Sequence, residues 1–276
     1  MTLLKNININ FLALSIIFLF SFSGCTSFSP HSFAEKHGFS EQIFVANTFD
    51  ITGYLRGKSS ILRVYFEGDG KAWLSRSRPS SDPTPHNPIS FYLAAADINP
   101  AVLYVARPCQ FVKDQHRRNC VTQFWTSARF SEPVLHDLNQ VLNQAKAIAG
   151  AQRLELVGYS GGGAVALLLA VRRNDVDLVV TIAGNLDHAF WTSYHHVSPL
   201  RDSLNPADYA VQTQSIKQIH IVSSADSIVP TAVSNSYLSK MNDTSKVQIV
   251  TVHGVKHTDD WSQIVPSILK KIDQHK

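Results

Sequence analysis

The feature that most constrains the fold of this chain is an alternation of short, apolar, β-branched segments with segments of helical periodicity. Strand patterns occupy residues 42–47, 49–56, 61–67, 101–106, 154–158, 177–182, 219–223 and 247–252. Helical patterns occupy residues 88–96, 133–148, 161–172 and about 259–272. Strands separated by helices form parallel sheets that are covered on both faces. The prediction is a single α/β domain over residues 42–276, whose mostly parallel sheet has eight strands and begins with a hairpin.

The N-terminus has the pattern of a secretory signal peptide. Lys5 precedes a largely apolar run over residues 11–22, and small residues then lead to Cys25. This run is short for a membrane-spanning helix, which needs about 20 apolar residues. We therefore expect residues 1–24 to be removed. An ordinary secretory peptide cut nearby and an uncleaved anchor are the alternatives.

The end of this segment, Phe22-Ser23-Gly24-Cys25, resembles the lipobox of bacterial lipoproteins, although Phe22 replaces the usual Leu. In that motif cleavage falls before the cysteine, which then carries lipid. The resemblance implies a protein anchored through Cys25 to a membrane of the bacterial cell envelope, facing the periplasm or the exterior. Residues 25–41 would hold the lipidated cysteine and a Ser-, Phe- and Pro-rich tether.

Charge and cysteine content narrow the partners further. The formal net charge is +4, and the basic residues are scattered along the chain, which does not favour nucleic acid as a partner. With Cys25 assigned to lipid, Cys109 and Cys120 remain as an even pair in an oxidising compartment, so we expect a disulfide. A zinc site with Cys109, His116 and Cys120 is the alternative, but it lacks a fourth nearby ligand.

A catalytic motif lies where the strand at 154–158 runs into a helix. The segment LELVGYSGG ends in Gly158-Tyr159-Ser160-Gly161-Gly162, a G-x-S-x-G pattern that places a serine at a sharp strand-to-helix turn. The glycines on each side allow the strand and the helix to approach closely. Ser160 is the predicted nucleophile, and a glycine-rich turn with an idle serine is the alternative.

A serine hydroxyl is a weak nucleophile, so it needs a histidine as base and an acid that orients the histidine. After the strand at 219–223 comes SADSIVP, which resembles the acid loop of the α/β-hydrolase superfamily, with Asp226 shortly before Val-Pro. After the last strand comes HGVKH, which resembles the G-x-x-H ending of that superfamily and implies His257 as base. His253 and, for the acid, Asp187 are the competing candidates. The order Ser, Asp, His and the strand count agree with the α/β-hydrolase fold.

The same resemblance implies an oxyanion hole. One donor would be the backbone N–H of Gly161, and the other that of Asp69 or Gly70 in the loop after the third strand. That loop reads Glu67-Gly68-Asp69-Gly70, where the superfamily often has His-Gly. Acidic side chains oppose a developing oxyanion, so both carboxylates must point away, be paired or face a cationic substrate group. Pairing with Arg76, with Arg78 or with backbone N–H groups is one solution.

The strings EGDGKAW and ARPCQ also resemble a group of poorly characterised bacterial α/β-hydrolase lipoproteins. Two long segments, 71–87 and a small cap insertion at about 184–214, follow strand ends at the edge where such sheets bind ligands. The expected function is a serine hydrolase that cleaves an ester or related acyl bond of a small-molecule or peptide substrate through an acyl-enzyme, with neither cofactor nor metal. A serine peptidase in which Glu67 or Asp69 binds a free amine, and a catalytically silent envelope binding protein, are the alternatives.

Overall fold

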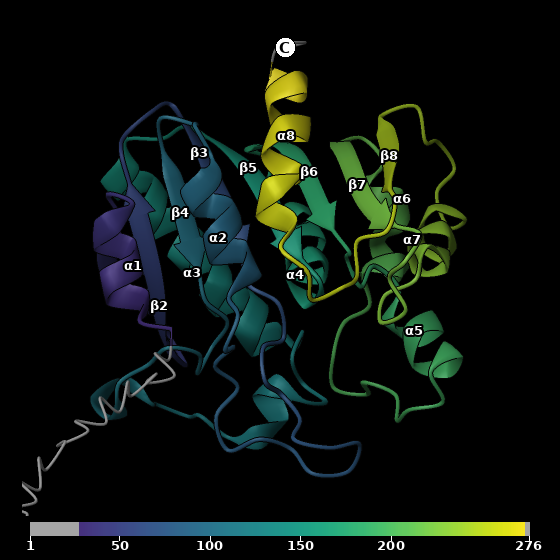
Figure 1. Ribbon diagram of the computed structural model, residues 1–276, viewed down its shortest axis with the longest axis horizontal. Helices are drawn as coiled ribbons and strands as arrows, with labels where there is room; N and C mark the ends of the chain where they lie inside the picture. The colour runs from purple at the N-terminus through teal and green to yellow at the C-terminus, as the bar shows by residue number, and fades with distance from the viewer. Residues whose placement is uncertain (1–27, 274–276) are drawn as a thin grey trace, which may run out of the picture.

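The computed structural model describes residues 28–273, so the expected signal peptide and Cys25 lie outside it. Its centre is one eight-stranded sheet of order β1-β2-β4-β3-β5-β6-β7-β8 (Figure 1). Only β2 runs antiparallel to its neighbours; the strands from β3 to β8 are parallel. The strands are β1 (Ser40–Val45), β2 (Asp50–Arg56), β3 (Ile61–Phe66), β4 (Val102–Val105), β5 (Arg153–Tyr159), β6 (Val176–Ile182), β7 (Lys217–Ser223) and β8 (Val247–Val252). The predicted strand count and mostly parallel sheet are confirmed.

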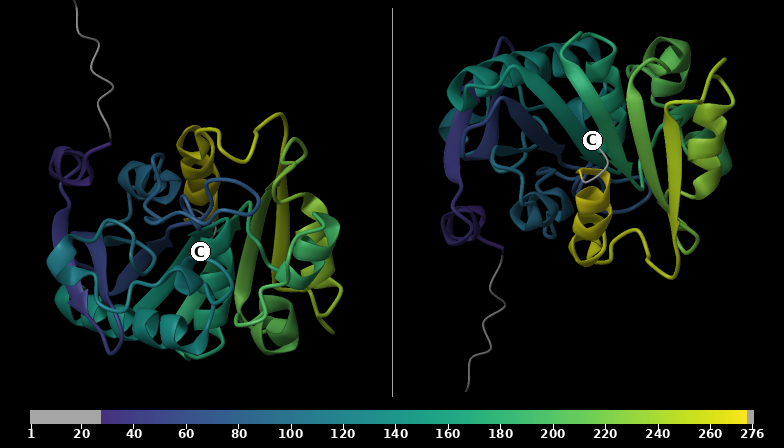
Figure 2. Two further views of the ribbon diagram at one scale, coloured as in Figure 1. Left: turned by 90° about the horizontal axis from the view of Figure 1, so that it is seen from below. Right: turned by 90° about the horizontal axis from the view of Figure 1, so that it is seen from above.

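Helices cover both faces of the sheet (Figure 2). On one face lie α3 (Glu132–Ala149) and α4 (Gly161–Ala170); on the other lie α2 (Ile89–Ala96) and α8 (Val265–Asp273). The remaining helices are α1 (Pro30–Lys36), α5 (His188–Tyr194), α6 (Ala210–Thr213) and α7 (Thr231–Leu238), with 3₁₀ turns at Asp114–His116, Thr122–Trp125, Pro206–Tyr209 and Trp261–Gln263. No helix within residues 28–273 is long and apolar enough to cross a membrane.

The core follows from the two periodicities in the sequence. Along β3, Leu62, Val64 and Phe66 point toward α3 and α4, while Tyr65 points to the opposite layer, as the two-residue period of a strand requires. All residues of α4 are buried, which suits a helix that is apolar on every side. Each such buried Leu, Val or Phe contributes about 1.5–3 kcal/mol. The packed sheet is therefore a rigid support for the loops at its edge.

Two sequence predictions about the ends of the domain are wrong. We expected a tether up to residue 41, but α1 begins at Pro30, where the Ser29 hydroxyl accepts a hydrogen bond from the Ser32 N–H, and Phe33 packs on Phe91 with ring centroids 5.0 Å apart. A serine cap followed by proline starts a helix even without a long periodic pattern. The last helix begins at Val265 and not near residue 259 because a 3₁₀ turn comes first.

Candidate active site

Ser160 lies between the end of β5 and the start of α4, with backbone angles φ 53° and ψ −120°. A non-glycine residue with positive φ is strained, and such strain is typical of functional turns. The flanking glycines are needed for close approach: a Cβ on Gly158 would lie 2.1 Å from the Gly162 carbonyl oxygen, and one on Gly162 would lie 2.3 Å from that of Phe66. The turn therefore has the sharp geometry that the G-x-S-x-G pattern predicts.

The structure brings together the three predicted side chains Ser160, His257 and Asp226. The distance from His257 Nε2 to Ser160 Oγ is 3.0 Å, and that from His257 Nδ1 to Asp226 Oδ2 is 2.7 Å. Asp226 and His257 are buried, and Ser160 is half-buried. Both ring nitrogens of His257 are thus engaged, one with the acid and one with the hydroxyl, although the three residues lie on separate loops after β5, β7 and β8.

Asp226 is held in its orientation by its own loop. Its Oδ1 accepts hydrogen bonds from the backbone N–H groups of Ile228 (2.9 Å) and Val229 (2.8 Å). These two bonds leave Oδ2 to face His257. The two backbone N–H groups restrict rotation of the carboxylate, so the loop holds Asp226 in the orientation that places Oδ2 against His257.

The backbone of His257 is fixed by two residues that the sequence analysis missed. Its carbonyl oxygen accepts hydrogen bonds from Tyr159 Oη (2.6 Å) and from Trp261 Nε1 (3.0 Å). The rings of Tyr159 and His257 also lie 5.1 Å apart, centroid to centroid. The position of Tyr159 next to the nucleophile was a sequence signal for such a role, whereas Trp261 had none.

The competing candidates lie elsewhere. His253 is exposed, and its Nδ1 contacts Ser224 Oγ at 3.2 Å. Asp187 caps α5: its Oδ1 accepts a hydrogen bond from the Phe190 N–H at 3.1 Å, and its Oδ2 accepts one from Ser236 Oγ at 2.7 Å. In the described structure neither residue forms a hydrogen bond with the imidazole of His257 or with Ser160, so His257 and Asp226 remain the candidates for base and acid.

The predicted oxyanion donors are open. Within the described part of the chain, the backbone N–H groups of Gly161, Asp69 and Gly70 have no hydrogen-bond acceptor, while the N–H of Gly68 donates to Glu67 Oε1 at 2.9 Å. Asp69 and Gly70 line the pocket in front of Ser160. A negatively charged oxygen at this place could therefore accept hydrogen bonds from backbone groups that nothing else occupies.

The carboxylate of Asp69 is paired, but not with the predicted residues. Arg129 Nη1 lies 2.5 Å from Asp69 Oδ2, and Arg107 Nη1 lies 3.3 Å from Asp69 Oδ1. Burial opposes ionisation of Asp69, but the two guanidinium groups outweigh it and lower its pKa. Arg76 and Arg78 are instead exposed, because they lie on a projecting loop. With two arginines around one aspartate, the cluster carries one net positive charge beside the pocket that contains Ser160.

Glu67 is buried beneath the same loop. Its Oε1 accepts the Gly68 N–H bond, and its Oε2 accepts a hydrogen bond from Tyr104 Oη at 3.2 Å. Burial raises the pKa of Glu67 to about 7, even though these hydrogen bonds favour the carboxylate. Glu67 therefore supports the loop from below and is not available to bind a substrate cation.

These residues surround a pocket of about 490 Å³ at the carboxyl edge of the sheet. The insertion 184–214 supplies one wall, since Trp191 lines the pocket and its Nε1 donates to the Ile228 carbonyl at 2.7 Å. Sequence analysis missed Asn185, which lies directly beyond β6. It is buried, lines the pocket, and its Oδ1 has no partner among the described residues. The pocket thus combines an apolar wall with a few polar groups, as ligand sites usually do.

The predicted disulfide between Cys109 and Cys120 is present, in the loop after β4, with a Cα–Cα distance of 5.6 Å. The zinc alternative does not fit, because both sulfurs are bonded to each other and His116 Nδ1 lies 2.9 Å from Asp50 Oδ2. Residues 28–273 contain no group of three or more side chains suited to hold a metal ion.

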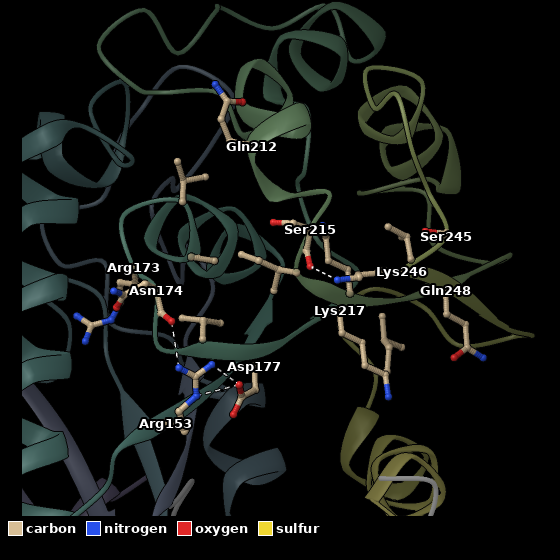
Figure 3. A pocket seen from close by; sticks show the side chains of 17 residues that line it. Arg153, Arg173, Asn174, Asp177, Gln212, Ser215, Lys217, Ser245, Lys246 and Gln248 are labelled. Atoms are coloured by element: carbon tan, nitrogen blue, oxygen red, sulfur yellow. Dashed lines mark hydrogen bonds and ion pairs between the residues drawn. The ribbon is translucent and has the colours of Figure 1, made fainter.

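A larger hollow, of about 790 Å³, lies at the opposite edge of the sheet, among the first residues of β5 to β8 (Figure 3). Several of its charged groups are already engaged: Arg153 pairs with Asp177, and Lys246 Nζ donates to the Ser215 carbonyl at 2.9 Å. No nucleophile and base face each other there in the described structure, so size alone does not make it the reaction site.

No protein-family model matches the chain, and no curated protein is similar to it in sequence. Solved structures do resemble it. Est1E from Butyrivibrio proteoclasticus, solved with ferulic acid bound, superposes with a TM-score of 0.62 at 13% identity, over 85% of this chain and 98% of the other. An α/β serine hydrolase without a lid from Xanthomonas campestris gives 0.57 at 14% identity, over 86% and 94%. An esterase from Pyrococcus furiosus gives 0.59 at 12% identity, over 88% and 95%. At these identities the likeness establishes the fold.

Proposed function

We propose that this chain, which has the α/β-hydrolase fold, is a serine hydrolase that cleaves an ester or related acyl bond. The observation that carries the proposal is the continuous set of hydrogen bonds from Asp226 through His257 to Ser160, at the base of a pocket with unoccupied backbone donors. A serine activated by a histidine that is oriented by an acid is the arrangement that acyl transfer requires.

In the proposed reaction, Ser160 Oγ attacks the acyl carbon while His257 Nε2 takes the hydroxyl proton. The tetrahedral oxyanion accepts hydrogen bonds from the N–H groups of Gly161 and of Asp69 or Gly70. His257 then gives its proton to the leaving group, and the acyl-enzyme forms. Water, deprotonated by His257, attacks the acyl carbon; the bond between this carbon and Ser160 Oγ then breaks, the acid leaves, and His257 returns the proton to Ser160 Oγ. Asp226 stabilises the imidazolium in both halves of the reaction.

The surroundings of the nucleophile favour an ester over a peptide with a free amine. An amine-binding site needs an available carboxylate, but Asp69 is neutralised by Arg107 and Arg129, and Glu67 is buried. The cluster of net positive charge would repel an ammonium group. Two of the structural neighbours are named as esterase or serine hydrolase, which supports the same choice. A silent binding protein would not need the hydrogen-bonded serine in a strained turn.

Covalent labelling tests the proposal. A fluorophosphonate probe should react with the wild-type protein and not with Ser160→Ala, while the circular dichroism spectrum stays unchanged. Ser224→Ala is the matched control, because Ser224 Oγ also contacts a histidine ring, that of His253, at 3.2 Å. The control should be labelled like the wild type. Labelling that persists in Ser160→Ala would rule out Ser160 as the nucleophile.

We also propose that the protein is anchored by lipid on Cys25 and faces the periplasm or the exterior. The lipobox-like sequence before Cys25 supports this. In cells, the wild-type protein should sediment with membranes, and Cys25→Ser should shift to the soluble fraction or remain as the uncleaved precursor. Mass spectrometry of the N-terminal peptide identifies the lipid. A wild-type protein found in the cytoplasmic fraction would contradict the proposal.

A further inference from the structure

The loop between β3 and α2 contains a hairpin, residues 71–78, which we call the tip. The N–H of Leu74 donates to the carbonyl of Arg78 at 2.8 Å, and Trp73 forms an antiparallel bridge with Pro79. These contacts define the shape of the turn but leave its apolar side chains uncovered. Trp73 is 44% exposed and Leu74 is 43% exposed, so each side chain presents a large apolar surface to solvent.

Three cations flank these two apolar side chains. Lys71, Arg76 and Arg78 are exposed, and the sequence holds no acidic residue from 71 to 81. Tryptophan is enriched at the interface between membrane and water, where its ring is apolar and its N–H reaches polar groups. Clustered lysine and arginine are attracted to anionic headgroups. The tip thus has the side chains that an anionic lipid surface binds.

The tip stands at the mouth of the candidate active site. Lys71 and Trp73 line the pocket in front of Ser160, and Figure 1 shows the loop in blue, projecting at the lower end of the molecule. Further exposed apolar side chains follow β4, β6 and β7 at the same edge, namely Val121, Tyr194, Val197 and Ile228. Isolated exposed apolar residues are ordinary, but here they gather on the edge that carries the pocket.

The start of the described chain lies at this edge too. The ring of Phe28 contacts that of Phe111, in the loop after β4, with centroids 6.3 Å apart, and that of Tyr92, in the first turn of α2, with centroids 5.7 Å apart. Cys25 precedes Phe28 by three residues, a stretch that reaches at most about 10 Å. An anchor at Cys25 would therefore bring the edge with the tip close to the bilayer.

We propose that the tip docks this edge on an anionic lipid bilayer. Trp73 and Leu74 enter the headgroup region, while Lys71, Arg76 and Arg78 contact anionic headgroups. The pocket then opens toward the membrane surface, from which a substrate with an apolar acyl chain can reach Ser160. The docking uses the proposed anchor only for proximity and does not depend on hydrolysis.

The test uses the mature protein reconstituted in vesicles of phosphatidylethanolamine and phosphatidylglycerol whose acyl chains carry bromine, a tryptophan quencher. The contribution of Trp73 is the difference between the emission of the wild type and that of Trp73→Phe. We expect brominated lipid to remove roughly half of this contribution or more, because interfacial tryptophan lies close to the acyl chains. Hydrolysis is not measured, so a failure of the proposed enzyme activity would leave this result unaffected.

Variants separate docking from mere proximity. Leu74→Asp and the double variant Arg76→Gln/Arg78→Gln should each weaken the quenching of Trp73, and so should vesicles of phosphatidylcholine alone. Ile98→Asp is the matched control, because Ile98 is 76% exposed but lies before β4, at the opposite edge. In this variant brominated lipid should quench the Trp73 emission as strongly as in the wild type. If brominated lipid left the Trp73 emission unchanged, the proposal would be overturned. Quenching of equal strength in phosphatidylcholine would overturn the role of the three cations.

Discussion

Tyr159 donates a hydrogen bond of 2.6 Å from its hydroxyl to the backbone carbonyl of His257. The residue that precedes the candidate nucleophile thus holds the main chain of the candidate base, across a sequence separation of 98 residues. Ser160 is held by its turn and His257 by this bond, so Tyr159 and Ser160, two adjacent residues, together help to set the distance between Ser160 Oγ and His257 Nε2.

Tyr159→Phe should therefore impair turnover more than stability. We expect kcat to fall roughly tenfold, since small misplacements of reacting groups are costly, and the free energy of unfolding to fall by about 1 kcal/mol for one buried hydrogen bond. Tyr237→Phe is the control: its buried hydroxyl bonds to Gln218 Oε1 at 2.9 Å, away from the pocket. It should lose similar stability and keep its kcat. Equal losses of kcat in both variants would refute a positioning role for Tyr159.

The base and acid should behave as one unit with the serine. His257→Ala and Asp226→Asn are each expected to lower kcat by about 10³-fold or more, and adding His257→Ala to Ser160→Ala should cost little further activity. His253→Ala should stay close to the wild type. Steady-state kinetics on a soluble ester measures these effects. If His253→Ala were inactive and His257→Ala active, the assignment of the base would be wrong.

Glu67 should make stability depend on pH. Burial raises its pKa in the folded protein to about 7, from 4.5 when exposed, so between these values the folded state binds a proton that the unfolded state has released. The contribution of Glu67 to the free energy of unfolding is complete below about pH 4.5. It is lost as pH rises through about 7, by roughly 3 kcal/mol at most. Glu67→Gln cannot ionise and should lack this decline. Urea unfolding from acidic to neutral pH compares the two, and parallel curves would contradict the effect.

Arg129 should matter because it neutralises Asp69 beside the nucleophile. Arg129→Met leaves the half-buried carboxylate with a single, longer contact to Arg107, so we expect a stability loss of about 2 kcal/mol and a lower kcat, because the cluster loses the net positive charge that favours an oxyanion. Asp69→Asn added to Arg129→Met should recover part of the stability. Thermal unfolding and ester hydrolysis measure both. A double variant less stable than Arg129→Met alone would contradict this account.

The disulfide should stabilise the loop after β4. It closes a loop with a sequence separation of 11, for which the chain-entropy account gives roughly 3 kcal/mol. Reduction should therefore lower Tm without unfolding the protein at room temperature. Differential scanning calorimetry with and without reductant tests this, and mass spectrometry of the unreduced digest should show Cys109 and Cys120 in one linked peptide pair. Two free thiols in the protein purified from the periplasm would show that the bond does not form.

The sequence by itself determined the features that local chemistry encodes. Alternating apolar segments predicted every strand, because side-chain periodicity is a property of each segment alone. The strained turn at Ser160 could be predicted from the glycines around it, because glycine is needed where the backbones of a strand and a helix nearly touch. Asp226 and His257 could be predicted as candidates because each stands in a short motif directly after a strand.

Only the tertiary structure decided which distant side chains meet. Arg107 and Arg129 pair with Asp69, and Arg129 lies 60 residues away from it, whereas the nearby Arg76 and Arg78 project from the tip. The burial that raises the pKa of Glu67, and the bond from Tyr159 to His257, likewise depend on how loops from several strands come together. α1 is held in place because Phe33 packs on Phe91 and Tyr92 of α2. Such contacts join segments far apart in the chain, so no local pattern carries them, and packing of the whole domain selects them.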